Sequence, residues 1–378
     1  MDKEALYQER SERINKAINL EPVDKIPAVY MGIAPAATNM GMSMKDYIED
    51  IDGACDITIA YMNKLGGTLD GINMHPPTRI TVLLTLLWLT KCKKPGYDLP
   101  DNSSWQMDEK EVMSIEEYDF IIKEGWQAFL GMHLPKVADM AEIQTGQEYL
   151  GTKSKGNIEK FRQNGYASVC CGLTSIPFEF VVGARSMAPF FLDCYRMPEK
   201  LKEVFDVITP ELIGLALMQT ELMGVPRIWV GGWRAASALV SPQIWDTLVF
   251  PYYVEMVNAL AEKGVTSILH WDQDWTRDLG RLKELPAKKC VFNPDGMTDV
   301  RKFKEIVGDR MAIMGDVPSS LFAVGTPEDI RNYVKDLVRD VGPTGLILCP
   351  GCDAPINAKP ENMQAFVDAC DEFSPVSA

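Results

Sequence analysis

Three residue types that bind zinc occur at the ends of two apolar runs. His270 ends the run in "SILHWDQDW" (267–275), and Asp272 follows two positions later. Cys352 lies just beyond another run, in "CPGCDAP" (349–355), where Pro350 and Gly351 place it on a turn. Three ligands of the nitrogen, oxygen and sulfur types with a fourth position open are typical of a catalytic zinc site, because structural sites use four protein ligands. We therefore predict that His270, Asp272 and Cys352 bind zinc.

Other roles for these residues stay open at this point. His270 is compatible with a buried structural histidine, and Asp272 with an N-terminal cap of the helix expected at "DWTRDLGRLKEL" (274–285). Without a metal, His270 and Asp272 would form a proton-donating pair. The cysteines within apolar runs, by contrast, are typical of the core: Cys170, Cys171, Cys290 and Cys349.

The elements that must position these residues are eight short apolar runs bounded by turn residues. They lie at 25–31, 69–74, 166–172, 226–232, 265–270, 288–293, 310–315 and 344–349. Most are followed by a helical pattern, such as 241–264 and 326–342, each with a Ser-Pro or Thr-Pro start and a glycine stop. Continuous apolar strands alternating with helices indicate a parallel sheet covered on both faces. We predict a single α/β domain over residues 1–378, a (β/α)₈ TIM barrel, with a doubly wound sheet as the second choice.

Two segments are longer than simple connections. Residues 1–24 are expected to form an N-terminal helical extension, and residues 75–115 a long insertion after the second strand. Long ordered loops in compact domains often cover active sites, so we expect the insertion to act as a lid. In a barrel, the catalytic residues lie where the strands end, which adds Glu179 as a catalytic candidate and Asp316 as a substrate-binding one.

Composition and charge exclude several classes of partner. The chain has 378 residues, a net charge of −15 and 46% hydrophobic residues, which indicates a folded domain and disfavours binding to nucleic acid or to an anionic membrane. The longest apolar run (80–90) is too short to span a bilayer, and the charged N-terminus has no signal-peptide core. Nine cysteines without a disulfide-like spacing suit a reducing compartment, so we expect a cytoplasmic protein.

Several stretches resemble the uroporphyrinogen decarboxylase superfamily across nearly the whole chain. They are "SERINKAINLEPVDKIPAV" (11–29), "GLTSIPFEFVVGARSMAPFFLDCYRMPEKLKEVFDVI" (172–208), "LVSPQIWDTLVFPYYVEMVNAL" (239–260) and "ILCPGCDAPINAKPENMQAFVDAC" (347–370). The resemblance implies a TIM barrel and either a decarboxylase or a cobalamin-dependent methyltransferase. The stretch that matches the decarboxylases' arginine-bearing segment, "YMGIAPAATNMGMS" (30–43), has no basic residue, which argues against a polycarboxylate substrate.

The methyltransferase branch of the superfamily implies a particular ligand set. Its thiol-methylating members bind zinc through a His-x-Cys pair and a later cysteine, and this chain has His270 and Cys352 at those places but Asp272 for the first cysteine. A carboxylate in place of a thiolate leaves a harder, stronger Lewis acid, which suits an oxygen leaving group. The sequence has no Asp-x-His-x-x-Gly stretch of the kind that holds a corrinoid, so a separate corrinoid protein would have to supply the cobalamin.

We therefore predict a methyltransferase of the O-demethylase type, which moves the methyl group of a small methoxylated compound to the cobalt(I) of a corrinoid protein. The substrate is expected to be a phenyl methyl ether, because the expected walls of its pocket are aromatic or sulfur-bearing: Tyr30, Met31, Met74, Phe178, Trp233 and Trp271. The alternatives are methylation of a thiol by a methyl-corrinoid protein, decarboxylation of a small acid, and a non-enzymatic corrinoid-protein-binding module. The sequence leaves open the direction of transfer in vivo and whether the chain forms a homo-oligomer.

Overall fold

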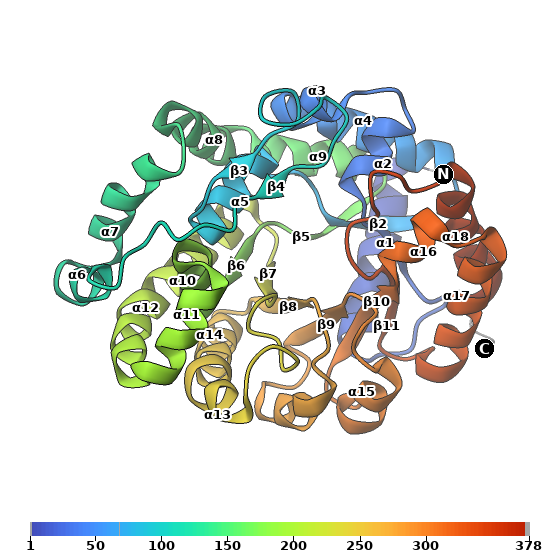
Figure 1. Ribbon diagram of the computed structural model, residues 1–378. Coiled ribbons are helices and arrows are strands. Elements are labelled where there is room, and N and C mark those ends of the chain that lie inside the picture. Colours follow the sequence, from blue (N-terminus) through green and yellow to red (C-terminus); the bar gives the residue numbers. More distant parts are fainter. Residues whose placement is uncertain (1, 68, 375–378) are drawn as a thin grey trace.

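The computed structural model, which describes residues 2–67 and 69–374, is built around one curled parallel sheet (Figure 1). Its strands occur in the order β5-β2-β1-β11-β10-β9-β8-β7-β6. Their bounds are β1 (Ala28–Tyr30), β2 (Leu69–Met74), β5 (Ala167–Cys170), β6 (Leu173–Ser175), β7 (Arg227–Gly231), β8 (Thr266–Trp271), β9 (Cys290–Pro294), β10 (Ala312–Val317) and β11 (Leu346–Pro350).

The two edge strands of this sheet are consecutive in the chain, which closes it into a barrel. Only Cys171 and Gly172 separate β5 from β6, and β5 pairs with β2 while β6 pairs with β7. The pairing with β7 continues through the gap, because the Cys171 N–H donates to the Arg227 carbonyl (3.2 Å) and the Trp229 N–H to the Gly172 carbonyl (3.0 Å). β5 and β6 are thus one interrupted strand. The TIM-barrel prediction is confirmed, although the predicted third strand ended at residue 172 and missed β6.

Helices cover the outside of the barrel between its strands (Figure 1). They are α2 (Ile33–Thr38), α3 (Met44–Glu49), α4 (Ile51–Leu65), α8 (Met140–Thr152), α9 (Ser154–Gln163), α10 (Pro177–Arg185), α11 (Met187–Arg196), α12 (Pro198–Met223), α13 (Pro242–Ile244), η2 (Trp245–Val249), α14 (Phe250–Glu262), η3 (Thr276–Glu284), α15 (Val300–Val307), α16 (Ser319–Val324), α17 (Pro327–Val341) and α18 (Pro360–Phe373).

The N-terminal helix α1 (Lys3–Ile18) is tied to the sheet by a buried ion pair. Arg13 Nη1 lies 2.5 Å from Asp70 Oδ1 on β2, and Asp70 Oδ2 accepts the backbone N–H of Ala28 on β1 (2.9 Å). Both charged side chains are buried, so each compensates the other's lost hydration. The pair fixes α1 against the first two strands.

The segment after β2 contains α5 (Ile80–Trp88), β3 (Cys92–Lys93) and β4 (Gln106–Met107), followed by α6 (Glu117–Glu124), α7 (Trp126–His133) and η1 (Leu134–Lys136). We call residues 75–115 the lid segment. Its helix α5 packs directly on α10, because a Cβ atom added at Gly183 would lie 2.1 Å from the Trp88 carbonyl oxygen. Only glycine at position 183 permits this approach.

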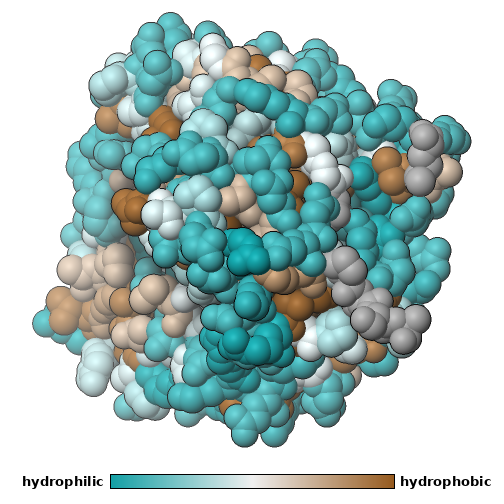
Figure 2. All heavy atoms as spheres, turned by 90° about the vertical axis from the view of Figure 1, so that its right-hand side faces the viewer, coloured by the Kyte–Doolittle hydropathy of each residue, from teal (hydrophilic) through white to brown (hydrophobic). Residues whose placement is uncertain are grey.

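The face of the molecule on the right of Figure 1, formed largely by the C-terminal helices, is mostly hydrophilic (Figure 2). Its apolar side chains lie in small separate groups. Within the described ranges, no helix combines the length and the apolar character needed to cross a bilayer.

The close contact of α5 with α10 gives a first prediction. Gly183→Ala should lower the free energy of unfolding by about 1–3 kcal/mol, because the new methyl group overlaps the Trp88 backbone. Since the overlap lies between the lid segment and the barrel, limited proteolysis should cut within 75–115 faster than in the original protein. The matched control is Gly131→Ala in α7, where an added Cβ meets nothing within 4 Å and should be neutral or stabilising. Equal protease resistance of the two variants would contradict the prediction.

Candidate functional site

His270, Asp272 and Cys352 converge at the C-terminal end of the barrel. His270 is the next-to-last residue of β8, Asp272 follows that strand directly, and Cys352 lies two residues beyond the end of β11. The His270 Nε2 atom is 3.5 Å from Asp272 Oδ1 and 3.7 Å from Cys352 Sγ, and all three donor atoms lie within 4.8 Å of one another. Zinc donors at about 2.0–2.3 Å in a tetrahedral arrangement lie roughly 3.3–3.8 Å apart. The spacing of the three side chains therefore suits one zinc ion.

The orientation of the His270 ring is fixed by two neighbouring amides. Asn293 Nδ2 donates to the Met314 carbonyl (2.6 Å), so the opposite atom, Asn293 Oδ1, accepts a hydrogen bond from His270 Nδ1 (3.0 Å). Asn73 also donates to Asn293 Oδ1 (3.1 Å), and the Trp229 ring stacks on the imidazole with centroids 4.2 Å apart. The proton of His270 is thus on Nδ1, and the lone pair of Nε2 faces Asp272 and Cys352, as a metal ligand requires.

Burial changes the protonation of all three side chains. It lowers the pKa of His270, so the ring is neutral and its contact with Asp272 is not an ion pair. It raises the pKa of Asp272 to about 7 and that of the Cys352 thiol well above its usual range. Asp272 Oδ1 is also buried without a hydrogen-bond partner. A divalent cation would supply the missing partner and stabilise both anions, so the donor set fits zinc.

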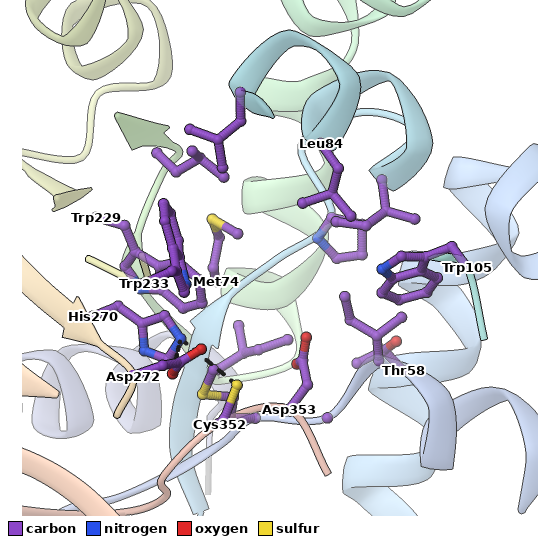
Figure 3. A pocket seen from close by; sticks show the side chains of 18 of the residues that line it. Thr58, Met74, Leu84, Trp105, Trp229, Trp233, His270, Asp272, Cys352 and Asp353 are labelled. Atoms are coloured by element: carbon purple, nitrogen blue, oxygen red, sulfur yellow. Dashed lines mark hydrogen bonds and ion pairs between the residues drawn. The ribbon is translucent and has the colours of Figure 1, made fainter. Parts of the chain in front are cut away.

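The three side chains lie at one end of a cavity of about 350 Å³ (Figure 3). This volume suits a small ligand with a single ring. Most of the wall is apolar or aromatic, and no lysine or arginine occurs among the described residues that line it. The lining residues are Tyr30, Met31, Gly32, Ile33, Tyr47, Thr58, Ile72, Met74, Pro76, Ile80, Leu84, Leu87, Trp88, Trp105, Met107, Leu173, Trp229, Trp233, His270, Asp272, Cys352 and Asp353.

The lid segment supplies one wall of this cavity. It contributes one residue before α5, four within α5, one before β4 and one within β4. They are Pro76, Ile80, Leu84, Leu87, Trp88, Trp105 and Met107. Trp88 packs edge to face on Trp233 (centroids 5.4 Å apart), and Arg234 binds Glu109 of the lid segment (2.9 Å). The lid segment therefore forms one wall of the cavity and is fastened to the loop after β7.

Four of the seven predicted substrate-binding residues line the cavity: Tyr30, Met31, Met74 and Trp233. The other three do not. Phe178 packs against Phe190 within the core, with centroids 4.8 Å apart, and Trp271 stacks on Trp275 (4.2 Å). Asp316 accepts the hydroxyl of Tyr333 (3.0 Å) and is buried away from the cavity. Trp271 and Asp316 lie in strands, where side chains alternate between the two faces, whereas Phe178 lies in α10 and packs into the core.

Glu179 does not reach the cavity either, which corrects the catalytic role expected for it. Its carboxylate is fully buried and accepts the backbone N–H groups of Trp233, Arg234 and Ala235 at 2.7–2.9 Å. These three donors belong to the loop after β7. Glu179 therefore acts as a positioning residue for that loop and for Trp233, which does line the cavity.

The sequence reasoning missed Asp353, a second carboxyl group in the cavity. Burial raises its pKa to about 6, and the backbone N–H of Ile33 stabilises its charged form. Figure 3 shows its side chain between Thr58 and the group of His270, Asp272 and Cys352, which we call the trio. Its position next to Cys352, beyond the end of β11, was the available signal. Trp88 is also unpredicted, and its buried Nε1 has no hydrogen-bond partner.

Comparison with known proteins identifies related sequences and the fold. A model of the uroporphyrinogen decarboxylase (URO-D) family matches residues 169–373, just over half of the 378-residue chain. The chain is 25% identical over 139 residues to the methylcobamide:CoM methyltransferase MtbA of Methanosarcina acetivorans, covering 37% of this chain and 40% of that protein. It is 24% identical over 199 residues to the uroporphyrinogen decarboxylase of Homo sapiens, covering 51% and 52%. The chain thus spans about half the length of the curated relatives it matches, or less.

A solved structure extends the likeness over the whole chain. A methyltransferase from Methanosarcina mazei superposes with a TM-score of 0.70, covering 96% of this chain and 98% of that one, at 17% sequence identity. At this identity the likeness shows the barrel fold.

Metal binding gives the second prediction. The purified protein should bind one equivalent of zinc, and Cys352→Ala should lose most of it, because the site then keeps only two ligands. The matched control is Cys349→Ala, which removes a buried thiol from β11 near the site but outside the trio. Zinc content after dialysis, measured with unfolding curves for both variants, checks the prediction. Equal zinc retention in the two variants would exclude Cys352 as a ligand.

The raised pKa values predict a pH dependence of zinc affinity. At pH 6 the free protein holds a proton on Cys352 and on Asp272, whose pKa is about 7, and zinc must displace both. Burial lowers the pKa of His270, which favours its neutral form, so the pH dependence is expected to come chiefly from Cys352 and Asp272. Between pH 6 and pH 8 the affinity should rise about a thousandfold, roughly 100-fold from Cys352 and about tenfold from Asp272. Competition with a chromophoric chelator measures this. In Asp272→Asn the rise should shrink to about 100-fold, and a flat profile in both proteins would refute the assignment.

Proposed function

Because the chain belongs to the uroporphyrinogen decarboxylase family, we propose that it is a cobalamin-dependent methyltransferase of that family. We further propose that it demethylates a small aryl methyl ether. The observation that carries this proposal is the composition of the cavity. A trio of zinc-type ligands stands at one end, and the rest of the wall is apolar and aromatic. Such a site suits a neutral arene whose polar atom meets the trio.

Decarboxylation of a polycarboxylate fits the cavity poorly. The charged residues among its described lining are the two aspartates, Asp272 and Asp353, and no basic side chain faces them. Each substrate carboxylate would lose its hydration without gaining a cationic partner, which costs several kcal/mol per charge, roughly. The same argument opposes decarboxylation of a smaller acid.

The residues of the trio can assist the loss of an oxygen leaving group. When methyl passes from an ether to cobalt(I), the carbon–oxygen bond breaks and the oxygen keeps the electron pair, so negative charge develops there. Zinc held by His270, Asp272 and Cys352 would supply Lewis acidity to that oxygen. The Asn293 amide keeps the Nε2 lone pair of His270 directed at the site. Trp229 and Trp233 provide aromatic walls, and the lid segment excludes water.

The cobalamin would be supplied by a separate corrinoid protein, since the chain lacks the Asp-x-His-x-x-Gly stretch that holds a bound corrinoid. The trio lies at the mouth of the barrel, where the loops after the strands meet, so a partner would approach from that side. The lid segment covers part of this approach and would have to move during the reaction.

Methylation of a thiol by a methyl-corrinoid protein is the second candidate. The observation in its favour is the similarity to MtbA, whose name records methyl transfer between a methylcobamide and CoM. Asp272 argues against this candidate. A carboxylate donates less electron density to zinc than the thiolate that the thiol-methylating enzymes of the superfamily have at this place.

The function is tested by the visible spectrum of a corrinoid protein. The protein is mixed with a corrinoid protein reduced to cobalt(I) and with a panel of aryl methyl ethers, and separately with a methylated corrinoid protein and thiols. The proposal predicts loss of the cobalt(I) band with ethers, formation of methyl-cobalt(III) and release of one phenol per cobalt. Turnover with thiols alone would replace the proposal by the second candidate, and no turnover with either would overturn both.

Position 272 gives a further prediction, because it is where the chain departs from the thiol-methylating enzymes that it resembles. Asp272→Cys should retain zinc, since both side chains bind as anions, but should lower kcat for aryl ethers by about tenfold or more with KM little changed. A thiolate donates more electron density, so an ether oxygen is polarised less. The loss should grow as the leaving phenol becomes less acidic. A uniform loss across phenols would mean that Asp272 only positions the substrate.

A further inference from the structure

Besides the trio and Asp353, the cavity has a further pair of polar side chains, on the side opposite the trio. Tyr47 of α3 and Thr58 of α4 both line the cavity and are both buried, with 4% and 1% exposed. Figure 3 shows Thr58 and His270 on opposite sides of the cavity. The Tyr47 hydroxyl lies 3.1 Å from Thr58 Oγ1. We call Tyr47 and Thr58 the distal hydroxyl pair.

The hydrogen bonds of this pair determine what it can offer to a ligand. Thr58 has one hydroxyl proton, and it is donated to the Ala54 carbonyl (2.7 Å). The hydrogen bond between the two hydroxyls must therefore be donated by Tyr47. Burial raises the pKa of Tyr47, so the phenol keeps this proton. Both hydroxyl protons are donated within the protein, so toward a ligand the two oxygens can only accept hydrogen bonds.

We propose that the distal hydroxyl pair accepts a hydrogen bond from a hydroxyl group of the substrate, whose methoxyl group meets the trio at the other end. The inference rests on the proposed aryl-ether function and narrows it. The substrate class is then a neutral methoxyphenol, a ring with a methoxyl group and a free hydroxyl group.

The same features exclude two related classes of arene. A methoxybenzoate would place a carboxylate, which only accepts hydrogen bonds, against oxygens that also only accept them. No lysine or arginine in the described part of the wall would neutralise its negative charge. A dimethoxybenzene would fill the same space without donating a hydrogen bond. Sites built around a buried hydrogen bond discriminate strongly against analogues that lack it, because the protein's polar atoms are then left unpaired.

The lid segment contributes one polar atom of the opposite kind. The buried indole N–H of Trp88 has no hydrogen-bond partner and belongs to a residue of the cavity wall. It offers a donor, whereas the distal hydroxyl pair offers acceptors. The two sets of polar atoms can thus bind different groups of one ligand.

The inference is tested by equilibrium binding, without any corrinoid protein. The isomeric methoxyphenols, the methylanisoles that carry a methyl group in place of the hydroxyl, and the methoxybenzoates are titrated into the zinc-loaded protein by calorimetry. The best-binding methoxyphenol should bind about tenfold more tightly than its methylanisole counterpart, and the benzoates should bind more weakly still.

Two variants of Thr58 show whether the distal hydroxyl pair causes this preference. Thr58→Val keeps the size of the side chain and removes one of the two acceptors. It also frees the Tyr47 hydroxyl to donate into the cavity, so the pair no longer offers acceptors alone. The advantage of the methoxyphenol should then fall to less than about twofold. Thr58→Ser keeps the hydroxyl and should keep the preference. Thermal unfolding of both variants confirms that they are folded.

The outcomes separate the inference from the proposed function. Equal affinity for the methoxyphenol and the methylanisole, or a preference that survives in Thr58→Val, would overturn the inference and leave the aryl-ether function standing. A preference in binding without methyl transfer to cobalt(I) would overturn the function and leave the recognition of a phenolic hydroxyl. Failure of every arene to bind would overturn both.

Discussion

The arrangement of the site depends on one electrostatic constraint: a carboxyl group, a thiol and a neutral imidazole lie together in a mostly buried position without a lysine or arginine beside them. The three donor atoms lie within 4.8 Å of one another, and no lysine or arginine occurs among the described residues of their cavity. Burial therefore favours the protonated forms of Asp272 and Cys352. A bound divalent cation reverses this preference, so the site is poised to exchange two protons for one metal ion.

Hydrogen bonds outside the trio hold the side chains and loops of the site in place. Asn293 on β9 directs His270, and Asn73 on β2 supports Asn293 across the interior of the barrel. Glu179 holds the loop after β7, and the lid segment packs on that loop through Trp88 and Trp233. Asn293 and His270 lie on consecutive strands, whereas the other contacts join elements that are more than fifty residues apart in the chain. The closed barrel makes them possible because it brings the ends of all its strands to one face.

Sequence reasoning identified the barrel because its strands are continuous apolar runs with clear breaks. The third strand was predicted to end with its apolar run at residue 172, whereas in the structure the strand resumes as β6 after Cys171 and Gly172. The trio was recognisable from residue types at two strand ends together with the family resemblance. The sequence did not indicate whether a side chain near a strand end points into the cavity or away from it, since this depends on packing between distant elements. This affected Phe178, Trp271, Asp316 and Glu179. Tyr47 and Thr58 were missed for the same reason: their helices show no chemical pattern until the fold places both against the cavity.

X-ray absorption at the zinc edge of the zinc-loaded protein is the most direct test of the ligand set proposed for the trio. This ligand set predicts one sulfur at about 2.3 Å, from Cys352, and nitrogen or oxygen donors at about 2.0–2.2 Å for the remaining positions. The sulfur contribution should disappear in Cys352→Ala. A spectrum with two or more sulfur donors, or one with no sulfur donor in the original protein, would contradict the account.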